Sequence, residues 1–418
     1  MLYPAFQKFY SAILNLERFK KENDFFCNIS SLDSFFSELR NVTFVIQKSL
    51  AHTENLHKYE KLRDKYFNDD ISRWLIKKRN QVLKEQPFEL EKSIVVTVFS
   101  MKGVFKSKRV FTVENDEPYQ SVLNSLKSFL LSFNELEVHF SVQFVYREID
   151  KQENIFDHIS KGITNMWSFL IELKNEVKDD SDLVTQMLEI IQTHSFLIAP
   201  IGIWHIDDYV YFSREKEFEK GKTTIISMPF WERMQINKLG DLLKMPACFF
   251  PADVDASMKP FWMFTIFHSI AYSYQKAICP TFWIFYQDET MDFIMYNATI
   301  RTTTYRKIYE VSQRILNESD IKSVFFVQEA YTYQNIDKSK VDELIQTEYK
   351  YRPSKFEPSS SLILFYLDAS GNDYYLTIDE KEVKSISNVL TALQHMDKGI
   401  VSSMFYMIRD AFLEKRLN

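Results

Sequence analysis

The residues best placed to do chemistry lie near the N-terminus, in the segment DDISRWLIKKRNQVLKEQPF at 69–88. If this segment is helical, with about 100° between successive residues, its apolar side chains form one arc. That arc consists of Leu75, Ile76, Val82 and Leu83. Arg79 falls within it, and a guanidinium is costly to bury unless it meets an anion. We therefore expect Arg79 either to pair with a structural carboxylate or to contact an anionic ligand.

Further cations surround Arg79. The same predicted helix carries Lys77, Lys78 and Lys84, and the preceding helix carries Lys58, Lys61, Arg63 and Lys65. Such a cluster can attract the phosphates of RNA. It is equally typical of a solvated helix face, because Glu60, Asp64 and Asp70 are interleaved with the cations.

Other candidate groups are weaker. His205, Asp207 and Asp208 follow a predicted strand, but one strand supplies too few ligands for a metal site. His268 lies among apolar residues and is predicted to be a core histidine with a satisfied hydrogen bond. We expect neither a metal nor a cofactor.

Composition excludes several classes of protein. The chain has only 7 Gly in 418 residues, where average usage is about 7%, and no two of them are close together. Loops that cradle phosphates need glycine, so dinucleotide-binding and P-loop motifs are absent. A net charge of −6 limits any RNA contact to a local patch. Three widely spaced cysteines and an N-terminus without a signal pattern predict a cytoplasmic protein without a membrane segment.

The periodicity of apolar residues predicts an α+β protein. Residues 1 to about 86 indicate four helices, the second beginning at a capping box of Ser30 and Asp33 and the fourth near Asp69 or Asp70. A hairpin with Gly103 near its turn follows, and strands and helices then alternate to the end. We predict a helical bundle at 1–90 and a mixed α+β domain at 91–418, with a split into two subdomains near 195 left open.

Two short segments resemble the HEPN superfamily of helical bundles. Arg40, Asn41, Val42, Thr43 and Phe44 match an upstream R-x-V-T-F signature of that family, and Arg79 with Asn80 matches its final-helix RN pair. The resemblance covers roughly the first 90 residues. The histidine of the family motif is replaced here, because its position falls on Lys84, or on Glu85 or Gln86 if the spacing is longer.

The resemblance implies an RNA-cleaving or RNA-binding homodimer of a bacterial defence or toxin-like system, and a metal-independent endoribonuclease if it is an enzyme. It implies that Arg79 contacts phosphate, Asn80 orients Arg79 and Lys84 stabilises charge, with Lys77, Lys78 and Arg40 binding RNA. The larger domain would then sense a trigger or hold a protein partner. Because the histidine is missing, a non-catalytic dimeric binding or scaffold protein is the alternative.

Overall fold

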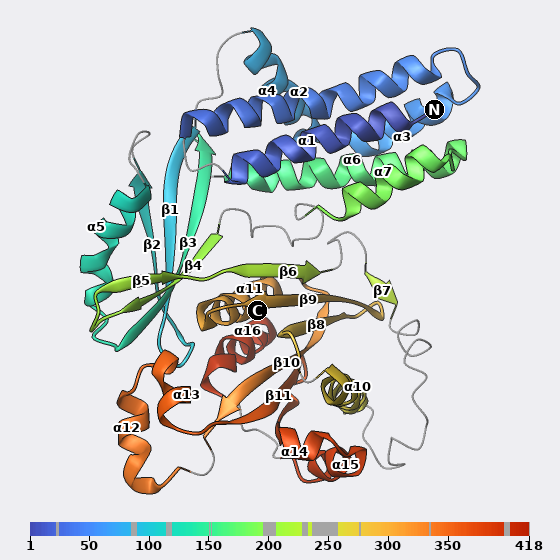
Figure 1. Ribbon diagram of the computed structural model, residues 1–418. Coiled ribbons are helices and arrows are strands. Elements are labelled where there is room, and N and C mark those ends of the chain that lie inside the picture. Colours follow the sequence, from blue (N-terminus) through green and yellow to red (C-terminus); the bar gives the residue numbers. More distant parts are fainter. Residues whose placement is uncertain are drawn as a thin grey trace.

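The computed structural model describes residues 1–21, 25–84, 90–113, 119–149, 151, 153–194, 206–227, 233–235, 258–275, 277–333, 336–396 and 402–417. A layer of helices is followed by two antiparallel β-sheets with helices packed on them (Figure 1). The chain is therefore an α+β protein, which confirms the predicted fold class.

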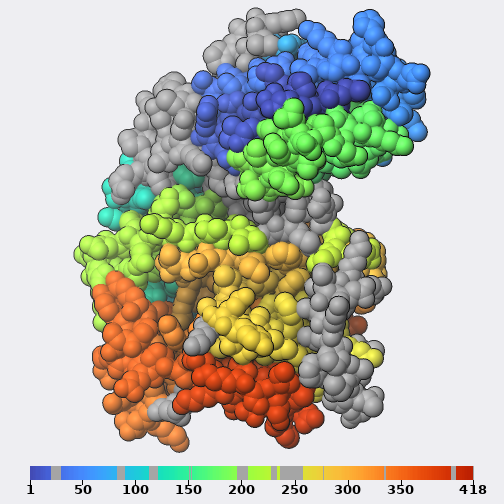
Figure 2. All heavy atoms as spheres, turned by 45° about the vertical axis from the view of Figure 1, so that its right-hand side comes forward, coloured from blue at the N-terminus to red at the C-terminus, as the bar shows by residue number. Residues whose placement is uncertain are grey.

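The helical layer combines the N-terminal helices with two helices from later in the chain. Its members are α1 (Tyr3–Lys21), α2 (Phe25–Leu50), α3 (Leu56–Phe67), α4 (Asp70–Lys84), α6 (Ile155–Val177) and α7 (Asp182–Gln192). One hydrophobic core joins them, and within it Phe9 of α1 stacks on Trp167 of α6 with ring centroids 5.9 Å apart. In Figure 2 these helices, in blue and green, form one lobe at the top of the molecule. The division at residue 90 stays a prediction, and the core of the first helices extends to α6 and α7.

The starts of two helices test the capping arguments. The fourth helix begins as predicted, because the Asp69 carboxylate accepts a hydrogen bond of 2.8 Å from the backbone N–H of Ser72. The prediction for the second helix is wrong: α2 begins at Phe25, before the supposed capping box at Ser30 and Asp33. The local pattern of a cap therefore occurs here inside a helix.

The first sheet has the strand order β2-β1-β3-β4-β5. Its strands are β1 (Leu90–Phe99), β2 (Phe105–Val113), β3 (Glu137–Glu148), β4 (Ile206–Phe212) and β5 (Glu217–Lys220), and α5 (Tyr119–Leu131) packs on its outer face. The predicted hairpin is confirmed as β1 and β2, and Gly103 has φ +76° in its turn. The strand predicted just before His205, at residues 195–204, lies outside the described residues.

The second sheet has the order β12-β11-β10-β8-β9-β6, with β7 paired to β9. Its strands are β6 (Thr223–Ser227), β7 (Met234–Gln235), β8 (Thr281–Tyr286), β9 (Thr290–Ala298), β10 (Ile321–Thr332), β11 (Ser359–Asp368) and β12 (Asp373–Asp379). One face packs on α10 (Lys259–Gln275), α14 (Glu380–Val383) and α15 (Ile386–Gln394), and the other on α11 (Arg301–Asn317) and α16 (Tyr406–Leu417). Both faces are thus covered by helices.

Helix α11 also joins the two sheets, because it contacts β3 and β4 of the first sheet as well as β9 of the second. Between β10 and β11 the chain forms two 3₁₀ turns, Lys338–Lys340 and Tyr349–Tyr351, and the short helices α12 (Val341–Gln346) and α13 (Arg352–Lys355). Of the helices that the structure describes, none has the length and apolarity to cross a bilayer.

Candidate functional site

A cavity of about 520 Å³ lies in the helical layer between α2, α3, α4 and α6. Its apolar wall includes Phe36, Leu39, Leu75 and Met166, and Arg40 and Arg63 contribute the positive charge of its lining. Small-molecule and cofactor sites are typically cavities of about 300–1,000 Å³ with mostly apolar walls and a few polar groups. This cavity has the size and lining of a ligand site.

The close approach of α4 and α6 shapes one wall of the cavity. Gly162 of α6 faces Leu75 of α4, and a Cβ atom added at Gly162 would lie 2.5 Å from Leu75 Cδ1. A larger residue at 162 therefore requires Leu75 to move. Both residues line the cavity.

Arg40 lies beside an exposed aromatic ring. Its guanidinium Cζ is 4.3 Å from the centroid of Phe44, which is 39% exposed, and its Nη1 donates to Thr43 Oγ1. Burial lowers the pKa of Arg40; Arg79 and Arg63 lower it as well, whereas Tyr59 raises it. The lining of the cavity thus includes a half-buried cation, and the aromatic ring that this cation faces, Phe44, lies next to the lining and not in it.

Arg63 provides the second cation. Its Nη2 is 2.9 Å from Asp64 Oδ1, in an exposed ion pair that also lines the cavity. Its Cζ lies 6.0 Å from the ring centroid of Tyr59. An exposed pair of this kind is weak and its partners separate easily, so Arg63 remains available to an anionic ligand.

Arg79 and Asn80 are neighbours in the structure as in the sequence. Arg79 is half-buried, and its Nη1 donates a hydrogen bond of 3.0 Å to Asn80 Oδ1. Its Nε is buried without a hydrogen-bond partner among the described residues. Arg79 is not part of the cavity lining, although its charge reaches Arg40. Lys84 is the last residue of α4, and its side chain lies outside the described residues.

Among the cations of α4 whose side chains the structure describes, the buried one is Lys78 rather than Arg79. Lys78 is 5% exposed and forms an ion pair with Glu148 Oε2 of β3. Trp74 Nε1 donates a hydrogen bond of 2.5 Å to the other carboxylate oxygen, Glu148 Oε1. Burial raises the pKa of Glu148, but the hydrogen bonds from Lys78 and Trp74 bring it below its ordinary value. Lys78 therefore anchors α4 to β3 and is not free for RNA, whereas Lys77 is exposed.

The aspartates of the His205 segment do not converge. Asp207 pairs with Lys220 Nζ at 2.8 Å, whereas Asp208 is buried and paired with Arg306. His205 lies outside the described residues. Within the described ranges no group of three metal-ligating side chains is close enough to hold an ion.

A buried ionic cluster surrounds Asp208 and was not predicted from the sequence. Arg306 donates hydrogen bonds to both carboxylate oxygens of Asp208, at 2.7 and 2.8 Å. It also donates to Glu310, and Glu310 accepts a hydrogen bond of 2.8 Å from Lys307. Burial lowers the pKa of Lys307 to about 8. Burial raises the pKa of Asp208, but Arg306 holds it below the ordinary value. The i, i+4 spacing of Arg306 and Glu310 could have predicted their ion pair from the sequence. Nothing in the sequence indicated that Asp208 of β4 would join them.

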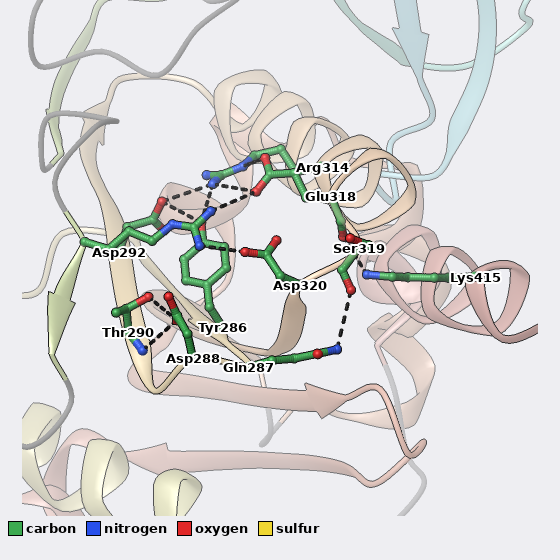
Figure 3. A network of polar contacts seen from close by, with 11 residues as sticks. Tyr286, Gln287, Asp288, Thr290, Asp292, Arg314, Glu318, Ser319, Asp320 and Lys415 are labelled. Atoms are coloured by element: carbon green, nitrogen blue, oxygen red, sulfur yellow. Dashed lines mark hydrogen bonds and ion pairs between the residues drawn. The ribbon is translucent and has the colours of Figure 1, made fainter. Parts of the chain in front are cut away.

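A second polar network lies between β8, β9 and α11 (Figure 3). Arg314 Nη2 donates to Tyr286 Oη at 2.6 Å and to Asp292 Oδ2 at 3.0 Å. Arg233 lies over the Tyr286 ring, with its Cζ 3.4 Å from the centroid, and pairs with Asp320 at 2.7 Å. Both guanidinium groups already meet carboxylates, so this network serves to fix the sheet to α11.

His268 confirms the prediction of a core histidine. It is 5% exposed, and its Nε2 accepts a hydrogen bond of 2.9 Å from Trp283 Nε1. Burial lowers its pKa to about 3.

Comparison with known proteins gives one match. Residues 17–106 match the family model described as bacteriophage lambda protein ea47. No curated protein and no solved structure matches the chain. The matched range includes α2, α3, α4 and β1 and therefore contains most of the cavity.

The resemblance to the HEPN superfamily is wrong. The family model that matches this region is that of the lambda protein, and no HEPN model matches. The two segments behind the resemblance are short, and the structure gives them ordinary helical roles: Arg40 to Phe44 lie in the middle of a 26-residue helix, and Arg79 bonds to its neighbour Asn80.

Proposed function

We propose that this protein binds single-stranded RNA, and that the cavity of the helical layer receives one nucleotide of it. The observation that carries the proposal is the pairing of Arg40 with Phe44 beside an apolar cavity of nucleotide size. Sequence-specific RNA recognition targets unstacked bases, which proteins hold on aromatic side chains and arginine planes.

The apolar wall supports a base inside the cavity. Phe36, Leu39 and Met166 offer surface to a planar ring, while Asn68 and Ser72 supply hydrogen-bonding groups in the same lining. Stacking on an aromatic side chain contributes about 1–3 kcal/mol per base.

The cations support a phosphate at the same place. Arg40 and Arg63 come from different helices, and Arg79 adds charge close to Arg40. Guanidinium groups bind phosphate through paired N–H donors, and each contact makes binding depend on salt.

Binding rather than cleavage is the activity we assign. Transfer of the 2′-hydroxyl proton needs a base near neutral pKa, and no histidine is among the described residues that line the cavity. His57 lies at the start of α3, whereas Arg63, Asp64 and Phe67 line the cavity near its end. Six residues of helix separate His57 from Arg63 by about 9 Å along the axis.

The test is the affinity of the full chain for a fluorescent single-stranded RNA, measured by anisotropy at several salt concentrations. We expect Arg40→Ala to weaken binding by about tenfold and to make the salt dependence shallower. Phe44→Ala is expected to weaken binding without changing the salt dependence, because Phe44 offers an exposed ring beside the cavity on which a neighbouring base can stack and carries no charge.

Arg409→Ala is the matched control. Arg409 of α16 lies over Tyr406 with a Cζ-to-centroid distance of 4.4 Å, the same arrangement as Arg40 and Phe44, but in the C-terminal part of the chain. Equal losses for Arg40→Ala and Arg409→Ala would mean general charge attraction and would contradict the site. Appearance of shorter RNA products without metal would contradict binding without cleavage, and Arg79→Ala would then show whether Arg79 takes part.

We infer that the protein works in the cytoplasm, which its three widely spaced cysteines support. The expected homodimer came from the HEPN resemblance alone and is not proposed again.

A further inference from the structure

A second hollow, of about 510 Å³, lies on the outer face of the first sheet between α5, β4 and β5. It is built from elements that do not contribute to the helical cavity. Binding at this hollow is therefore independent of the proposed RNA site.

Three ammonium groups surround this hollow from three elements. Lys127 comes from α5, Lys216 from the turn between β4 and β5, and Lys220 from β5. Two carboxylates lie nearby: Glu217 in the lining, and Asp207, which pairs with Lys220 at 2.8 Å. Three ammonium groups against two carboxylates leave the hollow with a net positive charge, which favours an anionic ligand.

The turn between β4 and β5 places Lys216 at the hollow. Lys216 has φ +55°, in the left-handed region that glycine and asparagine adopt most easily, and Lys178 and Glu289 have similar φ values elsewhere in the chain. The conformation shapes the turn, and the Lys216 side chain lines the hollow.

The floor of the hollow is apolar and aromatic. Phe218 and Leu123 line it, and Lys127 Nζ lies 5.4 Å from the centroid of the Phe218 ring. Tyr209, which is buried, lies below Lys220 at 5.9 Å. An anion that also carries a planar ring would satisfy both the lysines and this floor.

We propose that this hollow binds a nucleotide, with its phosphate held by Lys127, Lys216 and Lys220 and its base against Phe218. The ligand class follows from the combination of several ammonium groups with an aromatic floor, which a phosphate ion alone or a nucleoside alone matches only in part.

The experiment is isothermal titration calorimetry on the full chain with four probes: AMP, ATP, adenosine and inorganic phosphate. We expect AMP and ATP to bind at least fivefold more tightly than adenosine or phosphate. Lys127→Gln and Lys216→Asn should each weaken AMP binding by at least fivefold, and asparagine tolerates the positive φ at 216, so the turn is kept. Phe218→Leu should weaken AMP without weakening inorganic phosphate.

Lys108→Gln is the matched control, because Lys108 is exposed at the opposite edge of the same sheet, on β2. Equal loss in this control, or phosphate binding as tight as AMP, would overturn the proposal, as would no heat with AMP at millimolar concentration. Because the helical cavity could also take AMP, the AMP titrations are repeated in the Arg40→Ala background, where Lys127→Gln and Lys216→Asn should still weaken binding at least fivefold. Lys127→Gln should leave the proposed RNA affinity unchanged, so failure of one site is distinguished from failure of the other.

Discussion

Gly162 and Leu75 meet with no room for one additional carbon: a Cβ atom at 162 would lie 2.5 Å from Leu75 Cδ1. The contact lies where α4 crosses α6, and both residues line the helical cavity. The shape of the helical cavity proposed to bind RNA thus depends on a glycine of α6, a helix far along the chain from α4.

Gly162→Ala is therefore expected to separate affinity from stability. The end of the Leu75 side chain is flexible and can turn away from the new methyl group, which changes the cavity wall. Alanine also favours a helix over glycine by about 1 kcal/mol, which offsets the crowding. We expect the free energy of unfolding to change by less than about 1 kcal/mol, while the RNA affinity falls several-fold in the anisotropy assay.

The double variant Gly162→Ala with Leu75→Ala is the control. Without the Leu75 side chain the added methyl group has space, so Gly162→Ala should no longer lower affinity in the Leu75→Ala background. An equal loss in both backgrounds would show that the contact does not act through Leu75.

Glu148→Ala should destabilise the fold far more than the loss of a surface pair. It removes the carboxylate from the buried ammonium of Lys78, which keeps the uncharged Gln81 Oε1 at 3.2 Å, and from the half-buried indole N–H of Trp74. Breaking a buried pair on one side costs about 3–5 kcal/mol. Urea unfolding measures the difference.

Glu172→Ala is the matched comparison, since Glu172 pairs with Lys65 and Tyr66 on α3 at an exposed position. Its loss should cost no more than about 1 kcal/mol. Similar losses for the two variants would contradict the anchoring role of Lys78.

These contacts show why the sequence predicted elements better than their meeting points. The start of α4 after Asp69 and the turn at Gly103 depend on residues next to them, and both were predictable. The helical wheel of α4 marked Arg79, but Lys78 is the buried cation because Glu148 lies opposite it on β3. A helical wheel describes one helix only, so it cannot predict a contact with Glu148, which lies 70 residues further along the chain.

In the sheets too, the strands could be predicted but their order could not. Alternation along each strand predicted most of the strands, whereas the order β2-β1-β3-β4-β5 depends on which edges meet in space. The cavity needs Gly162 and Met166 of α6, which lie beyond the predicted bundle of residues 1–90. The spacing of apolar residues along the chain cannot predict that α6 packs against α2, α3 and α4. The cluster of charged residues at 58–84 was the one feature of the sequence that pointed to this region.

Stability should fall with acid because of His268. Its pKa is lowered to about 3 in the folded protein, against about 6.5 in the unfolded chain. Between these values the unfolded chain binds a proton that the folded protein does not, so stability is lost as pH falls from 6.5 towards 3. The slope from this group is up to about 1.4 kcal/mol per pH unit.

His268→Gln isolates this contribution. Glutamine does not titrate and its carbonyl oxygen can accept the hydrogen bond from Trp283, so the wild-type curve of unfolding free energy should be steeper than the variant curve between pH 6 and 4. Parallel curves would show that His268 titrates normally. His57→Gln, at an exposed position, should run parallel to the wild type.

Lys307 should give a slope of the same sign at alkaline pH, because its pKa is also lower in the folded protein than in the unfolded chain. Its pKa is about 8 in the folded protein and about 10.4 unfolded, because it is fully buried against Glu310. Between pH 8 and 10 the unfolded chain holds a proton that the folded protein has released, so stability rises with pH in this window. Lys307→Met removes the titrating ammonium group, and the unfolding free energy of this variant should not rise between pH 8 and 10, whatever its absolute value.

Lys322→Met is the control, because Lys322 is exposed and paired with Glu289; this variant should keep the rise seen in the wild type. A rise retained by Lys307→Met would assign the pH dependence to another group and leave Lys307 charged in the core.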